Sequence, residues 1–221
     1  MMLSKLIKRL IFVPKCASCG SCISLFPNGK LKMHESVCFC DKCYAEWHKE
    51  IAEICNSCAL PAHMCTCTPK LLSKYYKTIP SLCFYDSDSN KIQNKIIFSI
   101  KRLRNSELLT FLAYEIYPKI SKEIDSKNIS RKDLIFTWIP RKRSSITKYG
   151  FDHGKELCRI TANLFGAPFF PIFLRIGGKE QKNLDSSERI NNLRSSVILN
   201  KNLIGFPLNI RVQMKDRCLE Y

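Results

Sequence analysis

Pairs of cysteines crowd the first third of the chain and constrain its fold more than any other feature. Ten of the thirteen cysteines lie between Cys16 and Cys67, and three pairs follow the pattern Cys-x-x-Cys. A gap of two residues lets a tight turn direct both thiolates at one ion, and zinc takes four such ligands in a tetrahedron. Bound metal replaces the apolar core that so short a segment cannot build. The spacing therefore predicts a zinc-stabilised module over residues 14–70, most simply two zinc ribbons.

The pairs divide into two sites of four thiolates. The expected zinc ligands are Cys16, Cys19, Cys40 and Cys43 for one ion and Cys55, Cys58, Cys65 and Cys67 for the other. Four closed ligands indicate a structural rather than a catalytic metal. Cys22 and Cys38 stay open as alternative ligands, since the sequence Cys38-Phe39-Cys40 could provide its first thiol instead. His34, His48 and His63 are expected to be exposed side chains rather than ligands.

Disulfides, a redox pair and an iron–sulfur cluster are other uses of such cysteines. Disulfide scaffolds belong to secreted chains, and the first twelve residues are too short and too interrupted by charge for a secretory signal. Their apolar positions recur at helical spacing, so residues 1–13 are expected to form an amphipathic helix packed on the protein, with membrane-surface binding as the alternative. No apolar run approaches the ~18–20 residues of a transmembrane helix. Reduced thiols favour a cytoplasmic location.

Residues 71–221 alternate helix-like with strand-like segments, which indicates an α/β domain. Helices are expected over residues 92–103, 108–120, 152–165 and 186–193, and strands over 79–85, 134–139 and 169–174. Gly166 is the expected end of the third helix, and Asp185 or Ser186 the cap of the fourth. Strands alternating with helices imply a parallel sheet covered by helices.

Positive charge is concentrated in the middle of the chain. The formal net charge is +17, and residues 91–150 hold 14 Lys or Arg against 5 Asp or Glu. Candidate phosphate or nucleic-acid contacts at predicted helix and strand ends are Lys101, Arg102, Arg104, Arg141, Lys142 and Arg143. A solvated flank is the alternative. The charge favours polyanionic partners such as nucleic acid, anionic lipid or phosphorylated small molecules.

Together these features resemble the ComF family, competence proteins with a zinc ribbon ahead of a phosphoribosyltransferase-like domain. The paired cysteines, the basic helix end and the strand ending in Pro140 carry part of the resemblance. The segment Tyr149-Gly150-Phe151-Asp152-His153 is similar to the family's Arg-Gly-Phe-Asn-Gln, and Gln181, Leu184, Arg189 and Asn192 match its Gln, Leu, Arg, Asn spacing. The resemblance covers roughly residues 10–200. It implies a type I phosphoribosyltransferase-like parallel sheet with helices over residues 71–221, behind a double zinc ribbon.

The C-terminal part departs from the phosphoribosyltransferase pattern. Enzymes of that fold bind phosphoribosyl pyrophosphate (PRPP) with two adjacent acidic residues and a Thr-Gly turn, and the sequence contains neither. The family pattern is lost after about residue 204, and we hypothesise that the chain is truncated before the PRPP-binding loop. Binding of PRPP is therefore doubtful, and whether the protein is an enzyme stays open.

The resemblance implies a role in the uptake or processing of transforming DNA. In this interpretation the zinc ribbons and the basic surface bind single-stranded DNA or DNA-uptake proteins. One alternative is a phosphoribosyltransferase in which residues 141–143 meet the pyrophosphate of PRPP, and another is an inactive truncated fragment. For Arg189 and Asn192, three residues apart on one helical face, hydrogen bonding within the domain is the favoured role.

Overall fold

The computed structural model describes residues 13–23, 38–68, 81–84, 88–103, 105–179 and 184–203. Its elements in chain order are α2 (Asp41–Ile51), η2 (Ala62–Met64), α3 (Ile92–Leu103), α4 (Ser106–Ser126), η3 (Arg131–Asp133), α5 (Arg143–Tyr149), α6 (His153–Phe165), β1 (Phe173–Arg175), α7 (Ser186–Ser196), β2 (Val197–Leu199) and η5 (Lys201–Leu203). Almost all of the helix expected over residues 1–13 lies outside the described residues, as do His34, Arg104 and Gln181.

All four helices predicted from periodicity in the second part of the chain are confirmed. The predicted bounds of α3 hold at both ends, whereas α4 extends beyond the predicted residues 108–120 in both directions. Asp152 caps α6 by accepting the N–H groups of Gly154 at 3.0 Å and Lys155 at 3.2 Å. Asp185 caps α7 in a capping box with Glu188. Local capping chemistry therefore fixes the starts of both helices.

The described residues do not form the parallel sheet that the sequence predicted. Residues 134–139 are not a regular strand, and their one strand-like pairing is an isolated parallel bridge between Phe136 and Phe169. The regular strands, β1 and β2, pair antiparallel. Pro168 and Pro171 flank the bridge and lack the backbone N–H groups that a longer ladder would need. Residues 81–84, from the strand expected over 79–85, also have no strand structure.

The cysteine-rich part of the chain shares one hydrophobic core with α3 and α4. Phe39, Cys43 and Trp47 are buried in the same cluster as Ile96 and Leu108. The ring of Phe39 meets that of Phe111, on α4, edge-on with centroids 5.3 Å apart. A hydrogen bond joins α2 to α4, because the Trp47 indole N–H donates to Glu115 at 3.2 Å. The cysteine-rich part of the chain therefore packs into the main core.

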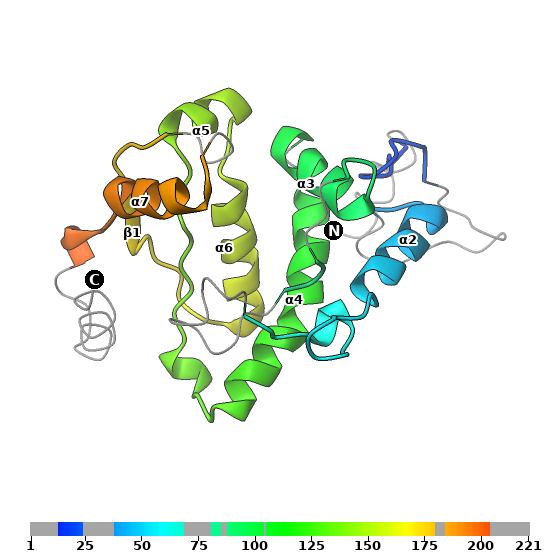
Figure 1. The fold of residues 1–221 in the computed structure, drawn as a ribbon, viewed down its shortest axis with the longest axis horizontal. Coiled ribbons are helices and arrows are strands. Elements are labelled where there is room, and N and C mark those ends of the chain that lie inside the picture. The colour runs from blue at the N-terminus through cyan, green and yellow to red at the C-terminus, as the bar shows by residue number, and fades with distance from the viewer. Residues whose placement is uncertain are drawn as a thin grey trace, which may run out of the picture.

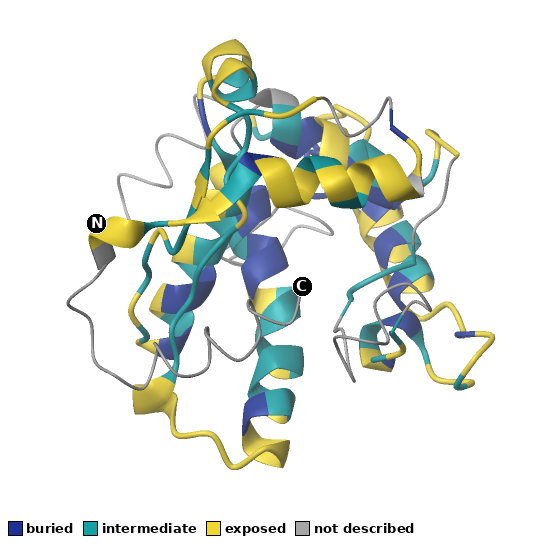
Figure 2. Ribbon diagram, turned by 60° about the vertical axis from the view of Figure 1, so that its left-hand side comes forward, coloured by how far each residue is buried: buried dark blue, intermediate teal, exposed yellow. Residues whose placement is uncertain are grey.

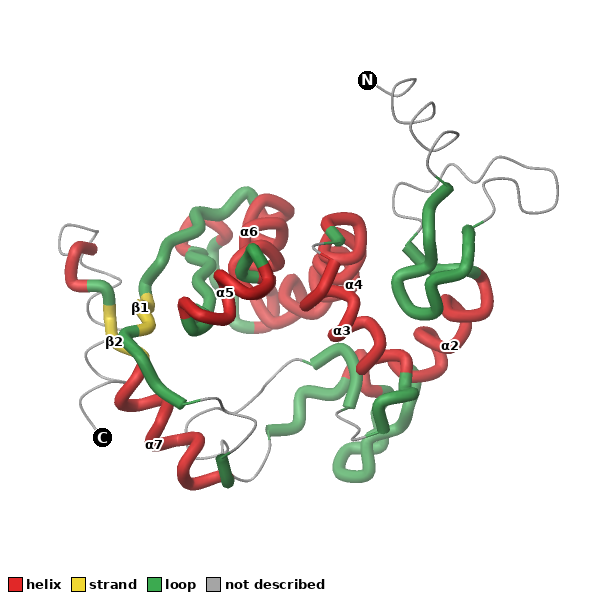
Figure 3. Tube along the Cα trace, turned by 90° about the horizontal axis from the view of Figure 1, so that it is seen from above, coloured by secondary structure: helices red, strands yellow, loops and turns green. Residues whose placement is uncertain are grey.

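The molecule is extended along the line from α2 to α7. Figures 1 and 3 show α2 at one end, the pair β1 and β2 with α7 at the other, and α3, α4 and α6 between them. Buried positions lie on these central helices and also on α2 (Figure 2). The α4–α6 interface contains the stacked rings of Tyr117 and Phe165, with centroids 4.4 Å apart, and Phe136 stacks on Phe165 at 5.4 Å.

Candidate metal centres and a basic cluster

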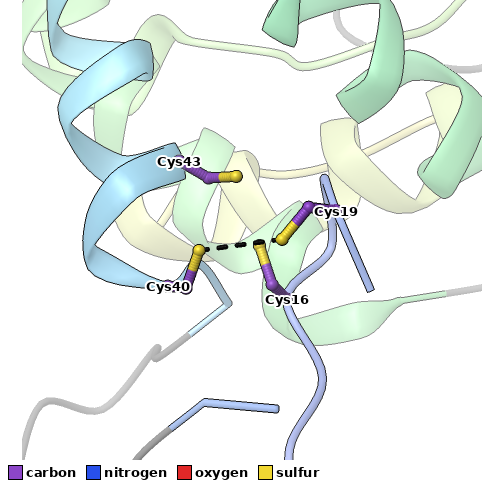
Figure 4. Close-up of side chains that lie close together, drawn as sticks. All are labelled: Cys16, Cys19, Cys40 and Cys43. Atoms are coloured by element: carbon purple, nitrogen blue, oxygen red, sulfur yellow. Dashed lines mark hydrogen bonds between the residues drawn. The ribbon is translucent and has the colours of Figure 1, made fainter. Parts of the chain in front are cut away.

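The first four predicted zinc ligands meet in one cluster. Cys16 and Cys19 come from a loop, whereas Cys40 directly precedes α2 and Cys43 lies in its first turn. Their sulfur atoms all lie within 4.8 Å of one another, and they point toward a common centre (Figure 4). The Cys19 and Cys40 sulfurs are 3.7 Å apart. A tetrahedron with Zn–S bonds of about 2.3 Å has edges of about 3.8 Å, so this spacing fits zinc.

The second four ligands also meet, at the opposite end of α2. Cys55, Cys58, Cys65 and Cys67 bring their sulfur atoms within 4.8 Å of one another. The Cys58 and Cys65 sulfurs are 3.7 Å apart, the same separation as in the first cluster. Each of the two groups could therefore hold a zinc ion, as the spacing of the cysteines predicted.

The loops that begin the two clusters have the same backbone structure. The N–H of Gly20 donates to the carbonyl of Cys16 at 2.9 Å, and the N–H of Ala59 donates to that of Cys55 at 2.9 Å. Each donor lies four residues after the first cysteine and has a positive φ, 75° at Gly20 and 55° at Ala59. A further backbone hydrogen bond of 2.7 Å closes the outer ends of both loops. The chain thus contains a repeated metal loop that the sequence revealed only as paired cysteines.

The second half of each site is built differently. In the first cluster Cys40 and Cys43 belong to the start of α2, where backbone N–H groups favour negative charge. In the second, Cys65 follows the short helix η2, and the N–H of Cys67 donates to the Cys65 sulfur at 3.4 Å. A tight turn therefore supplies only the first ligand pair of each site, and the second pair comes from the start of a helix in one site and from the segment after η2 in the other.

The thiols of each cluster ionise unequally. The Ser21 hydroxyl, 3.0 Å from the Cys19 sulfur, lowers the pKa of Cys19 to about 6, while burial raises the pKa of Cys43 to about 12. In the second cluster the N–H of Ser57 lowers the pKa of Cys55 to about 6, and burial raises the pKa of Cys65. Four thiolates this close repel one another, so a divalent cation is the group that would hold all four ionised.

The rival ligands lie outside both clusters. Cys22 is exposed, and Cys38 is buried in the core, where desolvation raises its pKa to about 12. His63 has its Nδ1 atom 2.7 Å from the carbonyl oxygen of Ile51, which it contacts as a donor. His48 is exposed and packs edge-on against Tyr44.

A lysine on α4 donates hydrogen bonds to the loop that carries the second cysteine cluster, residues 55–67. The Lys119 ammonium donates to the carbonyls of Ala62 and Cys65, each at 3.1 Å, and to the carbonyl of Ser81. Burial lowers the pKa of Lys119. Three carbonyls satisfy its three N–H donors, so Lys119 ties the loop to α4. Nothing in the sequence distinguishes this lysine from the others, because the contact depends on tertiary packing.

Arg141, one of the predicted phosphate contacts, is held by three neighbours. Its backbone N–H donates to the Asp152 carboxylate at 3.2 Å, and its guanidinium Nη1 lies 3.0 Å from His153 Nδ1. The guanidinium also covers the ring of Tyr149 at 5.1 Å. Lys142 precedes α5 and Arg143 begins it. The structure thus brings the basic segment 141–143 against the segment 149–153.

The residues of segment 149–153 have separate structural roles. Gly150 ends α5 in a left-handed conformation, Phe151 is buried in the core, and Asp152 caps α6. Burial, together with the positive charges of Arg141 and Lys101, lowers the pKa of His153. Lys101 belongs to α3, and Arg102 falls in the last turn of the same helix.

Lys155 and Trp138 form a second pairing of a cation and an aromatic ring. Trp138 stacks on Phe169 with ring centroids 4.6 Å apart, and the Lys155 ammonium is 5.5 Å from the centroid of Trp138. Lys155 and Ile139 are both exposed. Residues 138–155 therefore present aromatic rings and cations together, an arrangement that the sequence analysis did not identify.

Asn192 and Arg189 bond within the protein. Asn192 accepts the N–H of Lys179 at 2.7 Å and donates to its carbonyl at 3.1 Å. The Arg189 Nε–H donates to the carbonyl of Leu184 at 2.9 Å. Gly178, with φ of 97°, is needed in this loop because a Cβ there would lie 2.6 Å from that of Ser196.

None of the helices in the described part of the chain is long and apolar enough to cross a membrane. Comparison of the chain with protein-family models, with curated proteins and with solved structures found no match.

Proposed function

We propose that the protein is a zinc-stabilised nucleic-acid-binding protein of the ComF type, which binds single-stranded DNA in the cytoplasm during uptake or processing of transforming DNA. The observation that carries this proposal is the combination of cations and aromatic rings along residues 138–155. Single strands are bound by positive charge along the phosphates together with aromatic groups that contact the bases. Arg141 beside Tyr149 and Lys155 beside Trp138 supply both kinds of group.

The zinc ions have a structural role in this proposal. Each cluster uses four cysteines, which leaves no open coordination position for a substrate. The ions would stabilise the module that packs against α3 and α4, and the module's outer surface would be available to DNA-uptake proteins. In this proposal, bound zinc maintains the fold that positions the basic segment 141–143.

The resemblance to ComF supports a finer fold for residues 71–221, a phosphoribosyltransferase-like domain. The feature in keeping with it is the parallel bridge between Phe136 and Phe169, with α6 between the two segments in sequence. A parallel connection through a helix is the unit from which such sheets are built.

Salt dependence of DNA binding tests the proposed function. Affinity of the zinc-loaded protein for a fluorescent single-stranded oligonucleotide is measured by anisotropy from about 50 to 200 mM salt, where each phosphate contact contributes about −0.7 to the slope of log affinity against log salt. The triple variant R141Q/K142Q/R143Q is expected to bind more weakly and to reduce the slope by about 2.

The matched control is K49Q/K122Q/K132Q, which removes three exposed charges from α2, α4 and η3. It lowers the net charge equally but leaves the basic segment intact, so its slope should stay close to that of the parent protein. Equal losses in the two triple variants would show that only overall charge matters, and an affinity independent of salt would exclude electrostatic binding altogether.

A phosphoribosyltransferase is the second candidate function, because Arg141, Lys142 and Arg143 could also meet the pyrophosphate of PRPP. The sequence lacks two adjacent acidic residues for the ribose hydroxyls. Calorimetry with PRPP and Mg²⁺, followed by an assay for pyrophosphate release, distinguishes the two functions. Specific turnover that R141Q abolishes would favour the enzyme.

A further inference from the structure

The contact between Arg141 and His153 fixes the protonation state of the histidine. Arginine can only donate, so its Nη1 group, 3.0 Å from His153 Nδ1, requires a lone pair on that nitrogen. His153 is then neutral, with its proton on Nε2. A protonated His153 would turn an N–H toward the guanidinium, and the two donors would repel each other at this distance.

Three charged groups act on His153 in the described structure. Arg141, from the segment before α5, and Lys101, from α3, disfavour the protonated ring, while Asp152 at the start of α6 favours it. Asp152 is already engaged, because it caps α6 and accepts the backbone N–H of Arg141. Among the described residues no carboxylate forms an ion pair with the Arg141 guanidinium or with Lys101. Among the described residues, Asp152 is thus the one carboxylate that acts on His153, against two positive charges.

A tetrahedral anion adds negative charge beside Arg141 and His153. Its oxygens can accept from the Arg141 guanidinium, and the positive charge of Lys101 attracts the anion at longer range. An anion that separates the Arg141 guanidinium from His153 Nδ1 also accepts from a protonated Nδ1. The proton that was unfavourable beside two cations then becomes favourable, because it adds a charge-assisted hydrogen bond to the anion. Anion binding and protonation of His153 each promote the other by the same factor.

We propose that Arg141 and His153, in the positive field that Lys101 adds, form a binding site for one phosphate group, and that His153 takes up a proton from solvent when the phosphate binds. The proton returns to solvent when the phosphate leaves, so the site binds more tightly as pH falls. The proposal rests on the proposed function only for the source of the phosphate, a DNA backbone as opposed to a free phosphorylated molecule. The ComF segment has Gln where this chain has His153, so the proton linkage belongs to this chain's own residue.

Inorganic sulfate is the first probe, because it keeps the same charge from pH 5.5 to 7.5 and so isolates the titration of the protein. Sulfate affinity of the zinc-loaded protein is measured by calorimetry at both pH values. One proton taken up over two pH units strengthens binding by at most about 100-fold, and we expect at least about 10-fold. H153Q should show nearly the same sulfate affinity at both pH values, whereas R141Q should weaken binding at both and keep a dependence on pH.

The second measurement follows the histidine itself. The ring proton resonances of the four histidines are titrated by NMR with and without saturating sulfate, and H153Q assigns the resonance of His153. We expect sulfate to raise the pKa of His153. K132Q, which removes an exposed charge on η3, is the control for long-range electrostatics and should behave like the parent protein.

An unchanged titration of His153 in saturating sulfate would overturn the proposal, as would an equal pH dependence of sulfate affinity in H153Q. A single-stranded oligonucleotide then identifies the source of the phosphate. If it binds with the same dependence on pH and on His153, the source is DNA. If sulfate shows the linkage and the oligonucleotide does not bind, the phosphate site stands and the proposed DNA-binding function fails. If the oligonucleotide binds and neither probe shows the linkage to pH, the DNA-binding function stands and the proposed phosphate site fails.

Discussion

Ala59 occupies a backbone conformation that suits glycine. Its φ of 55° corresponds to 75° at Gly20, its equivalent in the first metal loop. A left-handed conformation costs about 1–2 kcal/mol for a residue with a Cβ. We therefore expect A59G to stabilise the zinc-loaded protein by about 1 kcal/mol, measured by urea unfolding at fixed free zinc.

Ala52 provides the matched control for A59G. It follows α2 with a φ of −89°, which any residue adopts easily. A52G should therefore destabilise the protein by about 0.4–1 kcal/mol, because the glycine adds freedom to the unfolded chain without relieving strain. Destabilisation by A59G would show that the second loop does not hold its left-handed turn.

Stability should fall in mild acid because of His153. Its pKa in the folded protein lies below the ordinary value of 6.5, so the unfolded chain binds the proton first. As pH falls below about 6.5 the unfolded state gains this proton, and stability decreases by up to about 1.4 kcal/mol per pH unit. Above that value the contribution is constant.

The contribution of His153 is isolated by measuring the free energy of unfolding in urea at pH 7.5 and 5.5 for the parent protein and for H153Q. The change between the two pH values in H153Q is subtracted from that in the parent, which removes the contribution of the metal ligands common to both. H153Q should lose less stability than the parent between these pH values. An equal loss would mean that His153 titrates as it does in the unfolded chain.

At the scale of single elements, Lys119 joins α4 to the second metal loop. K119M keeps the length of the side chain but leaves three carbonyls without their donor. We expect about 2 kcal/mol of destabilisation, because hydrogen bonds from a charged donor contribute about 1.5–3 kcal/mol each and the carbonyls partly recover bonds to water. Hydrogen exchange should become faster in residues 62–67.

K122M is the control for K119M, since Lys122 is exposed on the same helix. It should leave both stability and exchange in the metal loop nearly unchanged. Faster exchange in α4 alone, with none in the loop, would contradict the role assigned to Lys119.

The elements also show what sequence could and could not predict. Periodicity and caps such as Asp152 and Asp185 act within a few residues, so the helices were predictable. Likewise the spacing of the cysteines was enough to group the ligands of both clusters. How far residues 134–139 pair depends on partners far along the chain and on the prolines around Phe169, so the predicted strand is reduced to a single parallel bridge. The contacts of Lys119 and of Arg141 with His153 depend on how helices pack, which no local pattern reports.

At the scale of the whole molecule, the two metal clusters are not equivalent. Cys16 and Cys43 belong to the main hydrophobic core, whereas Cys55 and Cys65 are buried outside it. Structural zinc contributes about 10–16 kcal/mol to folding in small zinc modules, which is comparable to the total stability of a domain. Loss of the first ion should therefore unfold the central helices, while loss of the second should act locally.

C43S and C67S test this difference, with C22S as the control because Cys22 is an exposed cysteine outside both clusters. Mass spectrometry should find two zinc ions in C22S and one in each of the others. Near-ultraviolet circular dichroism should show C43S without fixed tertiary structure and C67S with most of it. Equal loss of structure in C43S and C67S would contradict the assignment.

The shared core also affects the lifetime of the protein in a cell. A protein whose metal ligands line its main core has no folded metal-free form to hold in reserve. Chains made when zinc is scarce would stay unfolded, and proteases remove unfolded chains. The amount of this protein would then follow the zinc supply without a dedicated regulator, because only zinc-loaded chains would fold and escape degradation.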